Sequence, residues 1–373
     1  MLERAVNRRY AITYTVKNEA KLLPDAIAYH RELGCARIYV FFDGTTDNSR
    51  DLVRDIDGVV CADSIEPRAL EDVPPWISQL LPRWQESMDV RKRINTHIAA
   101  GLARAEGIEW LINIDPDELL LLNSQEVDAI GDPEAFFTSI GGNVDQILAP
   151  NLEAVPVGEG TGRPFIDCTL FLRRFPTTEF VRRATSALLR RLLHSPMWQA
   201  WYDHWYYRVR FRGALPRLMH DPVTGASIPA GYFLGYSNHK AFIRTRTADE
   251  FRFNIHRWEK IHRRPISVKR GFILHYDLCS AEYFVEKFRQ RQPAMLVKAF
   301  YCRYMFARIA RESPFETARR FFLSEICISS PAVIARLLRR NIIVQINCIS
   351  QRFSRHEGSA QSQRFTASTI SDV

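Results

Sequence analysis

The segment Trp110-Leu111-Ile112-Asn113-Ile114-Asp115-Pro116-Asp117-Glu118 is an apolar strand that runs directly into three carboxylates. Strands normally end in turn residues that water or a helix start can satisfy. Clustered carboxylates repel one another at such an edge, which is costly unless a cation arrives. The spacing therefore indicates a divalent ion, held by Asp115 and Asp117, that carries a diphosphate. A charged turn that caps the next element is the alternative.

Two histidine-containing segments extend this metal hypothesis. Neutral imidazole completes many coordination spheres, so His275 in Leu274-His275-Tyr276-Asp277 is a candidate third ligand. The segment Ser237-Asn238-His239-Lys240 offers Lys240 as a phosphate contact. Mg²⁺ and Mn²⁺ favour oxygen ligands and keep open positions for substrate phosphates, so either ion suits the site. A hydrogen-bonded structural histidine is the alternative for His275.

Apolar runs and helical patterns alternate along the first 120 residues. Strands are expected at 10–16, 36–42, 58–62 and 110–114, and helices at about 20–33, 47–56 and 86–105. In the last helix a stripe of apolar residues should be buried, namely Val90, Ile94, Ile98, Leu102 and Ala105. This order predicts an α/β fold, in which a Rossmann-type, mixed and mostly parallel sheet is flanked by helices.

Ligands on such sheets bind at the carboxyl ends of the strands. Asn18 and Glu19 follow the first strand, and Asp43 ends the second, where it could contact a nucleotide's base or ribose. Arg91 and Asn95 lie four apart on the long helix, one step off its apolar stripe, so that both could face the same cleft. Shaping a turn is the alternative for Asp43, and a solvated helix face is the alternative for Arg91 and Asn95.

Charge is unevenly spread over the 373 residues, whose net charge is +9. Residues 171–220 carry ten arginines and two acidic residues, and residues 301–356 carry ten arginines and three glutamates. Such clusters indicate an anionic partner. Near the C-terminus, apolar pairs such as Val333-Ile334 alternate with arginines, which fits a helix lying on an anionic membrane surface. A helix packed on the catalytic lobe with solvated arginines fits equally well.

Cysteine usage and the N-terminal sequence bear on the compartment. The seven cysteines are odd in number, scattered and without a CxxC pair, which fits a reducing environment. The N-terminus has no apolar signal region, and no run of about eighteen apolar residues occurs. We therefore expect a cytoplasmic protein that is peripheral at the membrane if its C-terminal helices bind lipid.

Three stretches together resemble a known enzyme family: TVKNEAKLLPDAIAYHRELGCARIYVFFDGTTDNSRDLV at 15–53, RKRINTHIAAGLARAEGIEWLINIDPDELL at 91–120 and HYDLCSAEYFVEKF at 275–288. They resemble glycosyltransferase family 2-like proteins, close to the branch similar to family 92. The resemblance implies the GT-A fold, with Asp115 and Asp117 as its Asp-x-Asp motif, Asp43 at the nucleotide and His275 near the metal. Leu119 departs from the family pattern, which has Phe after the glutamate.

The resemblance also implies an activity. We expect a metal-dependent glycosyltransferase that moves a sugar from a nucleoside-diphosphate sugar, a UDP-sugar above all, to an acceptor hydroxyl with inversion. The acceptor would be a carbohydrate or glycoconjugate, and the pathway polysaccharide or glycoconjugate synthesis. A carboxylate should take the acceptor's proton. Glu153, Glu159, Asp167 and Asp203 are candidates that the sequence does not rank.

The expected domains follow from this activity. Residues 1–125 would form the nucleotide-sugar-binding half, 126–290 the acceptor-binding half, 291–353 a basic helical extension and 354–373 a disordered tail.

Two other classes of protein remain open. A sugar nucleotidyltransferase would carry a Gly-rich phosphate loop after the first strand, where Lys17-Asn18-Glu19 stands instead. A non-catalytic basic binding protein could use the aromatic and basic residues between Trp198 and Arg212 to stack bases, but a buried core or a sugar-binding wall suits them equally. We expect no nucleic-acid partner.

Overall fold

The computed structural model describes residues 9–70, 73–123, 128–173, 218–225, 227–229, 238–290 and 301–355. The chain divides into two compact units: unit 1 comprises Met1–Asn151 and Asn238–Leu274, and unit 2 comprises Leu152–Ser237 and His275–Val373. The basic aromatic segment 180–212, with Asp203, lies outside the described residues, and so does the expected tail from residue 356 onward. Ser354 and Arg355, also expected in that tail, end a helical segment at 348–355.

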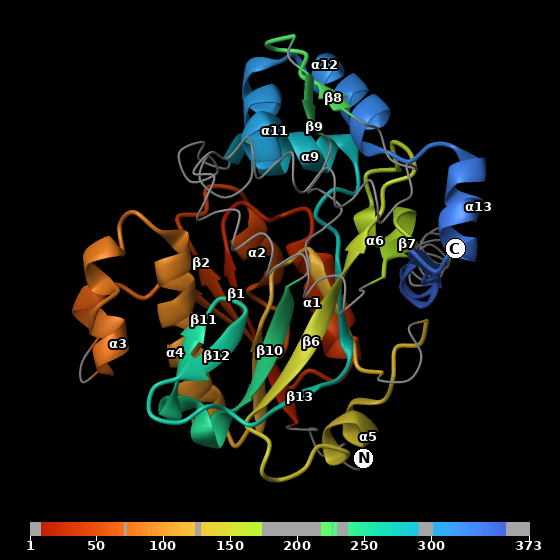
Figure 1. Cartoon of the computed structure of the whole chain (residues 1–373). Coiled ribbons are helices and arrows are strands. Elements are labelled where there is room, and N and C mark those ends of the chain that lie inside the picture. The colour runs from red at the N-terminus through yellow and green to blue at the C-terminus, as the bar shows by residue number, and fades with distance from the viewer. Residues whose placement is uncertain are drawn as a thin grey trace, which may run out of the picture. The chain divides into compact units, whose positions relative to one another are not determined.

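Unit 1 contains most of the sheet (Figure 1). Its strands are β1 (Tyr10–Val16), β2 (Arg37–Phe42), β3 (Val59–Asp63), β4 (Trp110–Asn113), β5 (Glu118–Leu121), β10 (His239–Arg244), β11 (Phe251–Asn254), β12 (Arg257–Lys260) and β13 (Ser267–Lys269). Its helices are α1 (Leu23–Glu32), α2 (Ser49–Val53), α3 (Pro75–Ser78), α4 (Met88–Ala105) and α5 (Pro133–Thr138). Strands β6 (Gln146–Ala154) and β14 (Phe272–His275) start in unit 1 and end in unit 2.

Strand order in unit 1 is β6-β10-β4-β1-β2-β3. The pairs β1–β2, β2–β3 and β1–β4 are parallel, and β13 is parallel to β6. Strand β10 is antiparallel to both of its neighbours, β4 and β6. The predicted α/β class with a mixed, mostly parallel sheet is therefore confirmed.

Alternate residues of each strand point to opposite faces of this sheet, and helices cover both faces. Ala11, Tyr39 and Leu111 join a cluster with the buried face of α4. On the other face, the hydroxyl of Tyr14 lies 3.0 Å from Nδ1 of His30 on α1. The parallel strands are thus buried on both sides, as their near-continuous apolar sequences require.

Helix α4 forms where predicted, but its predicted apolar stripe is wrong. Val90 and Ile94 are buried, whereas Leu102 is 43% exposed and Ala105 is exposed. A helix advances about 100° per residue, so each step of four residues rotates the stripe by about 40°. Residues spaced by four therefore lie on the buried side at the start of α4 and on the exposed side at its end. The buried face continues instead through Asn95, Thr96, Ala99, Ala100 and Ala103.

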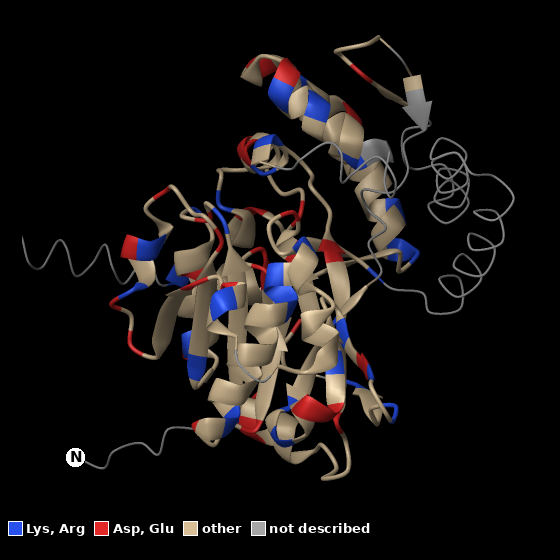
Figure 2. Cartoon of the chain, turned by 90° about the vertical axis from the view of Figure 1, so that its left-hand side faces the viewer, with Lys and Arg blue, Asp and Glu red and all other residues tan. Residues whose placement is uncertain are grey.

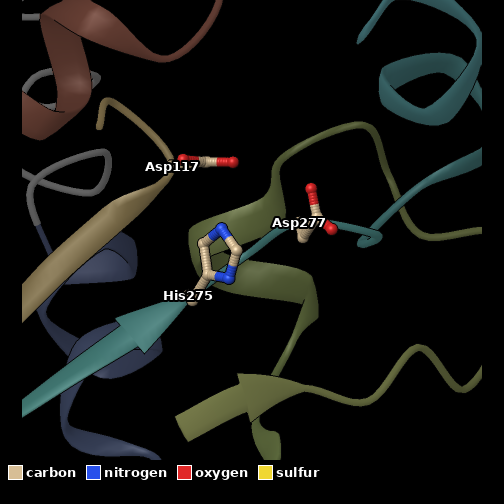
Figure 3. A group of neighbouring side chains, drawn as sticks. All are labelled: Asp117, His275 and Asp277. Atoms are coloured by element: carbon tan, nitrogen blue, oxygen red, sulfur yellow. The ribbon is translucent and has the colours of Figure 1, made fainter. Parts of the chain in front are cut away.

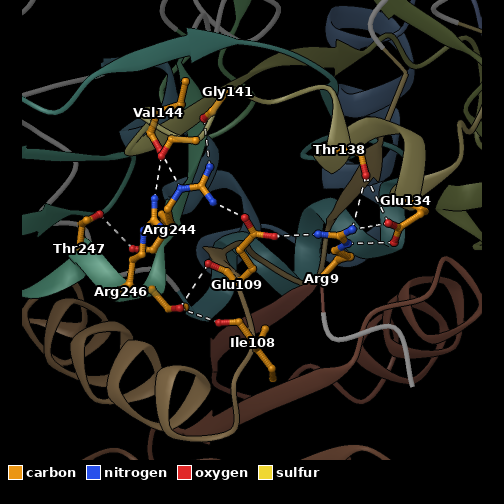
Figure 4. A network of polar contacts seen from close by, with 12 residues as sticks. Arg9, Ile108, Glu109, Glu134, Thr138, Gly141, Val144, Arg244, Arg246 and Thr247 are labelled. Atoms are coloured by element: carbon orange, nitrogen blue, oxygen red, sulfur yellow. Dashed lines mark hydrogen bonds and ion pairs between the residues drawn. The ribbon is translucent and has the colours of Figure 1, made fainter. Parts of the chain in front are cut away.

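A charged network fastens β10 to β4 at the strand end remote from the Asp115 turn (Figure 4). Arg244 is 4% exposed, pairs with Glu109, and donates from Nε to the carbonyl of Val144 at 2.9 Å. Its guanidinium also lies over the Trp110 ring, 4.2 Å from the centroid. Arg9 pairs with Glu109 from the other side, at 3.1 Å.

Unit 2 is mainly helical. It contains α6 (Pro164–Asp167), β7 (Leu170–Leu172), β8 (Leu218–His220), β9 (Ser227–Pro229), α9 (Ala281–Gln290), α11 (Tyr301–Glu312), α12 (Phe315–Phe321), η5 (Phe322–Ile326), α13 (Pro331–Arg339) and β15 (Ile343–Gln345). Its core is rich in phenylalanine: Phe284, Phe288, Phe306 and Phe322 are fully buried and belong to one cluster.

No single helix in the described residues is long and apolar enough to cross a membrane. The segments Phe315–Ile326 and Pro331–Arg339, bent by 44° at the break between them, meet the length and composition requirement only as a pair.

Candidate functional site

The carboxyl ends of β1 and β2 are tied together by Asn18. Its backbone has a φ of +56°, a conformation that asparagine tolerates better than most residues. Its side-chain oxygen accepts hydrogen bonds from the backbone N–H groups of Thr46 at 2.7 Å and Asp47 at 3.2 Å. Asp47 in turn accepts from the N–H of Ala20 at 3.0 Å. The loops that carry Asn18, Glu19 and Asp43 are therefore held as one rigid rim.

Asp43 and Arg91, both predicted substrate contacts, lie together. Nε and Nη2 of Arg91 donate to the two carboxylate oxygens of Asp43, at 2.5 and 2.8 Å. Ser64 donates to the same carboxylate at 2.8 Å. The guanidinium also lies 5.5 Å from the centroid of the half-buried Trp84 ring. A planar cation beside an aromatic ring and an oriented carboxylate form a surface on which a nucleoside could stack and hydrogen-bond.

Asn95, the third residue predicted here, is fully buried. Its side-chain oxygen accepts from the N–H of Ile65, and its nitrogen donates to Thr15 and Ser64, all within 3.0 to 3.2 Å. Asn95 therefore links α4 to the ends of β1 and β3 and positions Ser64 against Asp43.

Two carboxylates in the turn that follows β4, Asp115 and Glu118, form an ion cluster with two ammonium groups. These belong to Lys92 on α4 and Lys240 on β10. Asp115 pairs through one oxygen with Lys92 and through the other with Lys240, at 2.9 Å. Lys240 is 2% exposed and also contacts Glu118 at 2.8 Å. Burial alone would raise the pKa of Asp115, but the ammonium groups of Lys240 and Lys92 bring it well below its usual range. Two lysines thus relieve the charge repulsion that the sequence suggested a metal would relieve at Asp115.

Backbone geometry locks this turn. The N–H of Glu118 donates to the carbonyl of Asp115 at 2.9 Å, and the Glu118 carboxylate accepts from the N–H of Asp115 at 2.8 Å. Pro116 occupies the second position of this four-residue turn, which its fixed φ favours. Asp117 is left at the tip, 4% exposed.

Lys92, which pairs with Asp115, was not among the predicted site residues. Its position carried a signal, because it lies three, four and seven residues before Asn95, Thr96 and Ala99, on the buried face of α4. A lysine on a buried helix face needs a carboxylate partner.

His275 ends β14 and is oriented by a buried carboxylate. Its Nδ1 lies 2.7 and 2.9 Å from the two oxygens of Glu153, which is 2% exposed and stands on β6. Burial raises the pKa of Glu153 to about 7, although the neighbouring His275 opposes this shift. An imidazole that donates one ring N–H to a carboxylate has its other nitrogen, Nε2, aimed and made more basic, as in many metal-ligating histidines.

Asp277, two residues later, is buried between two cations. Its carboxylate is 2.5 Å from the Lys287 ammonium and also pairs with Arg303. Asp277 was not among the predicted site residues, although it stands in the segment Leu274-His275-Tyr276-Asp277.

Figure 3 draws three buried side chains, Asp117 of unit 1 and His275 and Asp277 of unit 2, each of which offers a ligand atom that could bind a metal ion. Two of them, Asp117 and His275, are predicted ligands. Asp115, the other predicted ligand, has Lys92 and Lys240 as partners, and its role at a metal stays a prediction.

Three of the four candidate bases lie in the described residues, and each has a partner. Glu153 holds His275. Asp167 accepts from the N–H groups of Thr161 and Arg163, at 2.7 and 3.0 Å, and so shapes the loop 158–162, which contains three glycines. Glu159 pairs with Arg319.

No known family model matches the chain. Two glycosyltransferase-like proteins of Arabidopsis thaliana are each 23% identical to it. The first match covers 67% of this chain and 43% of the relative, and the second covers 86% and 66%. This chain therefore spans less than two thirds of either relative.

A solved structure, glucosyl-3-phosphoglycerate synthase of Mycobacterium tuberculosis in complex with Mn²⁺, UDP and glucosyl-3-phosphoglycerate, is 12% identical. The match covers 64% of this chain and 58% of that chain, with a TM-score of 0.27. A score of this size is too low to establish a shared fold.

Proposed function

We propose that this protein is a glycosyltransferase that uses a nucleoside-diphosphate sugar and a divalent metal ion. The observation that carries the proposal is the buried His275 of unit 2, which Glu153 orients and which lies two residues from the buried Asp277; Asp117 of unit 1 is the proposed further ligand. The glycosyltransferase-like relatives support the same class of enzyme. The donor is proposed to be a UDP-sugar, and the acceptor a carbohydrate or glycoconjugate in polysaccharide or glycoconjugate synthesis.

The side chains fit Mn²⁺ or Mg²⁺. Two carboxylates and one imidazole are a donor set that Mn²⁺ accepts readily and Mg²⁺ accepts when waters and phosphates complete its sphere. When bound, the ion would act as a Lewis acid that stabilises the negative charge developing on the departing diphosphate. The protein's part is to position the carboxylates and to aim the imidazole.

Buried cations pair with carboxylates in both units. Lys287 and Arg303 keep a positive environment around Asp277, and each is 11% exposed. Lys240 and Lys92 do the same for Asp115, in the turn that presents Asp117. A metal beside so many cations leaves an excess of positive charge that a polyanion such as a diphosphate would neutralise. We therefore also propose that Lys240 contacts the phosphates of the donor.

The strand ends of β1 and β2 are proposed to take the nucleoside. Asp43 is oriented by Arg91 and Ser64, so its carboxylate is available in one fixed direction. Asn18 and Glu19 lie in the loop that follows β1, and Asn95 donates a hydrogen bond to Thr15 near the end of that strand. We also propose that the sugar is transferred with inversion of its anomeric configuration. A carboxylate, which we do not assign, would take the acceptor's proton.

The test is a thermal-shift and calorimetric titration of the full chain with Mn²⁺, alone and with UDP- or GDP-sugars. Asp117→Asn removes a charged ligand while keeping the shape, and should abolish Mn²⁺-dependent stabilisation and donor hydrolysis or transfer. Asp57→Asn is the matched control, because the Asp57 side chain is 98% exposed in the same unit. If Asp117→Asn binds Mn²⁺ and turns over donor as the wild type does, the proposal fails.

A further inference from the structure

The C-terminal part of unit 2 carries a surface of arginines on one helix face. Arg336, Arg339 and Arg340 are spaced three and four residues apart at the end of α13, so they share one side of the helix. Leu337 is fully buried on the other side, where Val333, Ile334 and Leu338 pack against the phenylalanine-rich core. The helix is thus fixed on its unit by its apolar side and presents Arg339 and Arg340 outward, whereas Arg336 is half-buried.

These three arginines differ from most others in the described residues, because no carboxylate pairs with them. The segment 326–355 has five arginines, Arg336, Arg339, Arg340, Arg352 and Arg355, and contains neither aspartate nor glutamate. The Nε atom of Arg336 is buried without a hydrogen-bond partner. Over the sheet, by contrast, basic and acidic residues lie interspersed (Figure 2). The three arginine charges at the end of α13, with no carboxylate paired to them among the described residues, repel one another, and an external anion would relieve that repulsion.

We propose that this arginine surface, made of Arg336, Arg339 and Arg340, docks the protein on an anionic lipid membrane. Guanidinium groups bind lipid phosphates and carboxylates in bidentate fashion. Val333, Ile334 and Leu338 pack against the phenylalanine-rich core but keep part of their surface exposed.

The same residues favour lipid over nucleic acid. Proteins that bind single-stranded nucleic acid add aromatic rings on which bases stack. Segment 326–355 has no tryptophan or tyrosine, and its one phenylalanine, Phe353, is buried. The apolar residues that accompany the arginines are aliphatic.

The experiment is sedimentation of the full chain with vesicles. One set contains only phosphatidylcholine, and the other contains about one-third phosphatidylserine, the anionic lipid that attracts basic segments. The wild type should bind the anionic vesicles, and binding should weaken as salt rises. The combined variant Arg336→Gln, Arg339→Gln and Arg340→Gln should lower the partition coefficient about 100-fold, because each basic residue near the surface adds about 1 kcal/mol.

The matched control is Arg54→Gln, Arg68→Gln and Arg257→Gln, which removes the same charge from exposed positions in unit 1. It should bind anionic vesicles as the wild type does. Both variants should keep the wild-type melting temperature and donor turnover in solution, so that the membrane proposal and the proposed function fail separately.

Three results would overturn the proposal: equal binding to neutral and anionic vesicles, equal losses in the two variants, or vesicle binding unchanged in the α13 variant. Tight binding of single-stranded DNA that is lost in the α13 variant, without vesicle binding, would assign the surface to nucleic acid instead.

Discussion

Nδ1 of His275 lies 2.7 Å from Oε1 of Glu153, although the two residues are 122 positions apart in the chain. Both are buried, and β6 and β14 carry them to neighbouring places. This contact fixes the direction of Nε2. A rotating imidazole would have to lose that freedom on binding an ion, whereas an imidazole already held by a carboxylate does not.

Glu153→Gln should therefore weaken Mn²⁺ binding by about 10- to 100-fold, because the imidazole loses its charged acceptor. Calorimetric titration of Mn²⁺ measures the change directly. Glu159→Gln is the control, since Glu159 is a half-exposed carboxylate in the same unit, paired with Arg319. Equal Mn²⁺ affinity in wild type and Glu153→Gln would show that Glu153 does not support the metal site.

Lys92→Met should destabilise the protein by about 1 to 2 kcal/mol, because it leaves the Asp115 carboxylate, whose side chain is 34% exposed, with one lysine in place of two. Urea unfolding gives the free energy. Adding Asp115→Asn should restore part of the loss, because Asp115 and Glu118 then no longer share the single ammonium group of Lys240. Additive losses in the double variant would mean that the two side chains do not interact.

Leu102→Glu and Ala103→Leu test the orientation of α4. Leu102 is 43% exposed, so the change to glutamate should alter the free energy of unfolding by less than about 0.5 kcal/mol. Ala103 is fully buried, and a larger side chain there should cost about 1 to 3 kcal/mol. The opposite ranking in urea unfolding would support the stripe expected from the sequence.

Stability should fall as the solution is acidified below about pH 6.5, in part because of His30. Burial lowers the pKa of His30 to about 3 in the folded protein, against about 6.5 in the unfolded chain. Between these values the unfolded state takes up the proton and the folded state does not, so the free energy of unfolding loses about 1.4 kcal/mol per pH unit from this group.

Urea midpoints at pH 7, 6 and 5 measure that slope. His30→Gln should flatten it, and the exposed His262→Gln should leave it unchanged. An identical pH slope in His30→Gln and the wild type would remove His30 as a cause. The side chain matters to the fold because Nε2 of His30 accepts from the N–H of Leu120 on β5, at 3.3 Å.

The order of strands and helices in the first 120 residues was predictable, because the pattern that predicts each element lies within a short stretch of sequence. Trp110–Asn113 is uniformly apolar and forms a strand, and Gly34 and Gly107 end their helices with positive φ. The turn at Asp115–Glu118 follows from Pro116 and the acidic residues around it. Asp117 and His275 could likewise be proposed from their places at strand ends.

Local sequence could not supply the partners of those residues. Lys92 and Lys240 meet Asp115, and Glu153 meets His275, across 23, 125 and 122 positions of the chain. Such pairings depend on strand order and on which helix face is buried. A repeat of four residues does not fix that face, because it drifts around the helix.

By itself, then, the sequence determined the α/β class, the acidic turn after β4 and the basic C-terminal segment. The tertiary structure decided which cation neutralises which carboxylate, since burial and distance set the strength of an ion pair and both arise only when distant strands pack together.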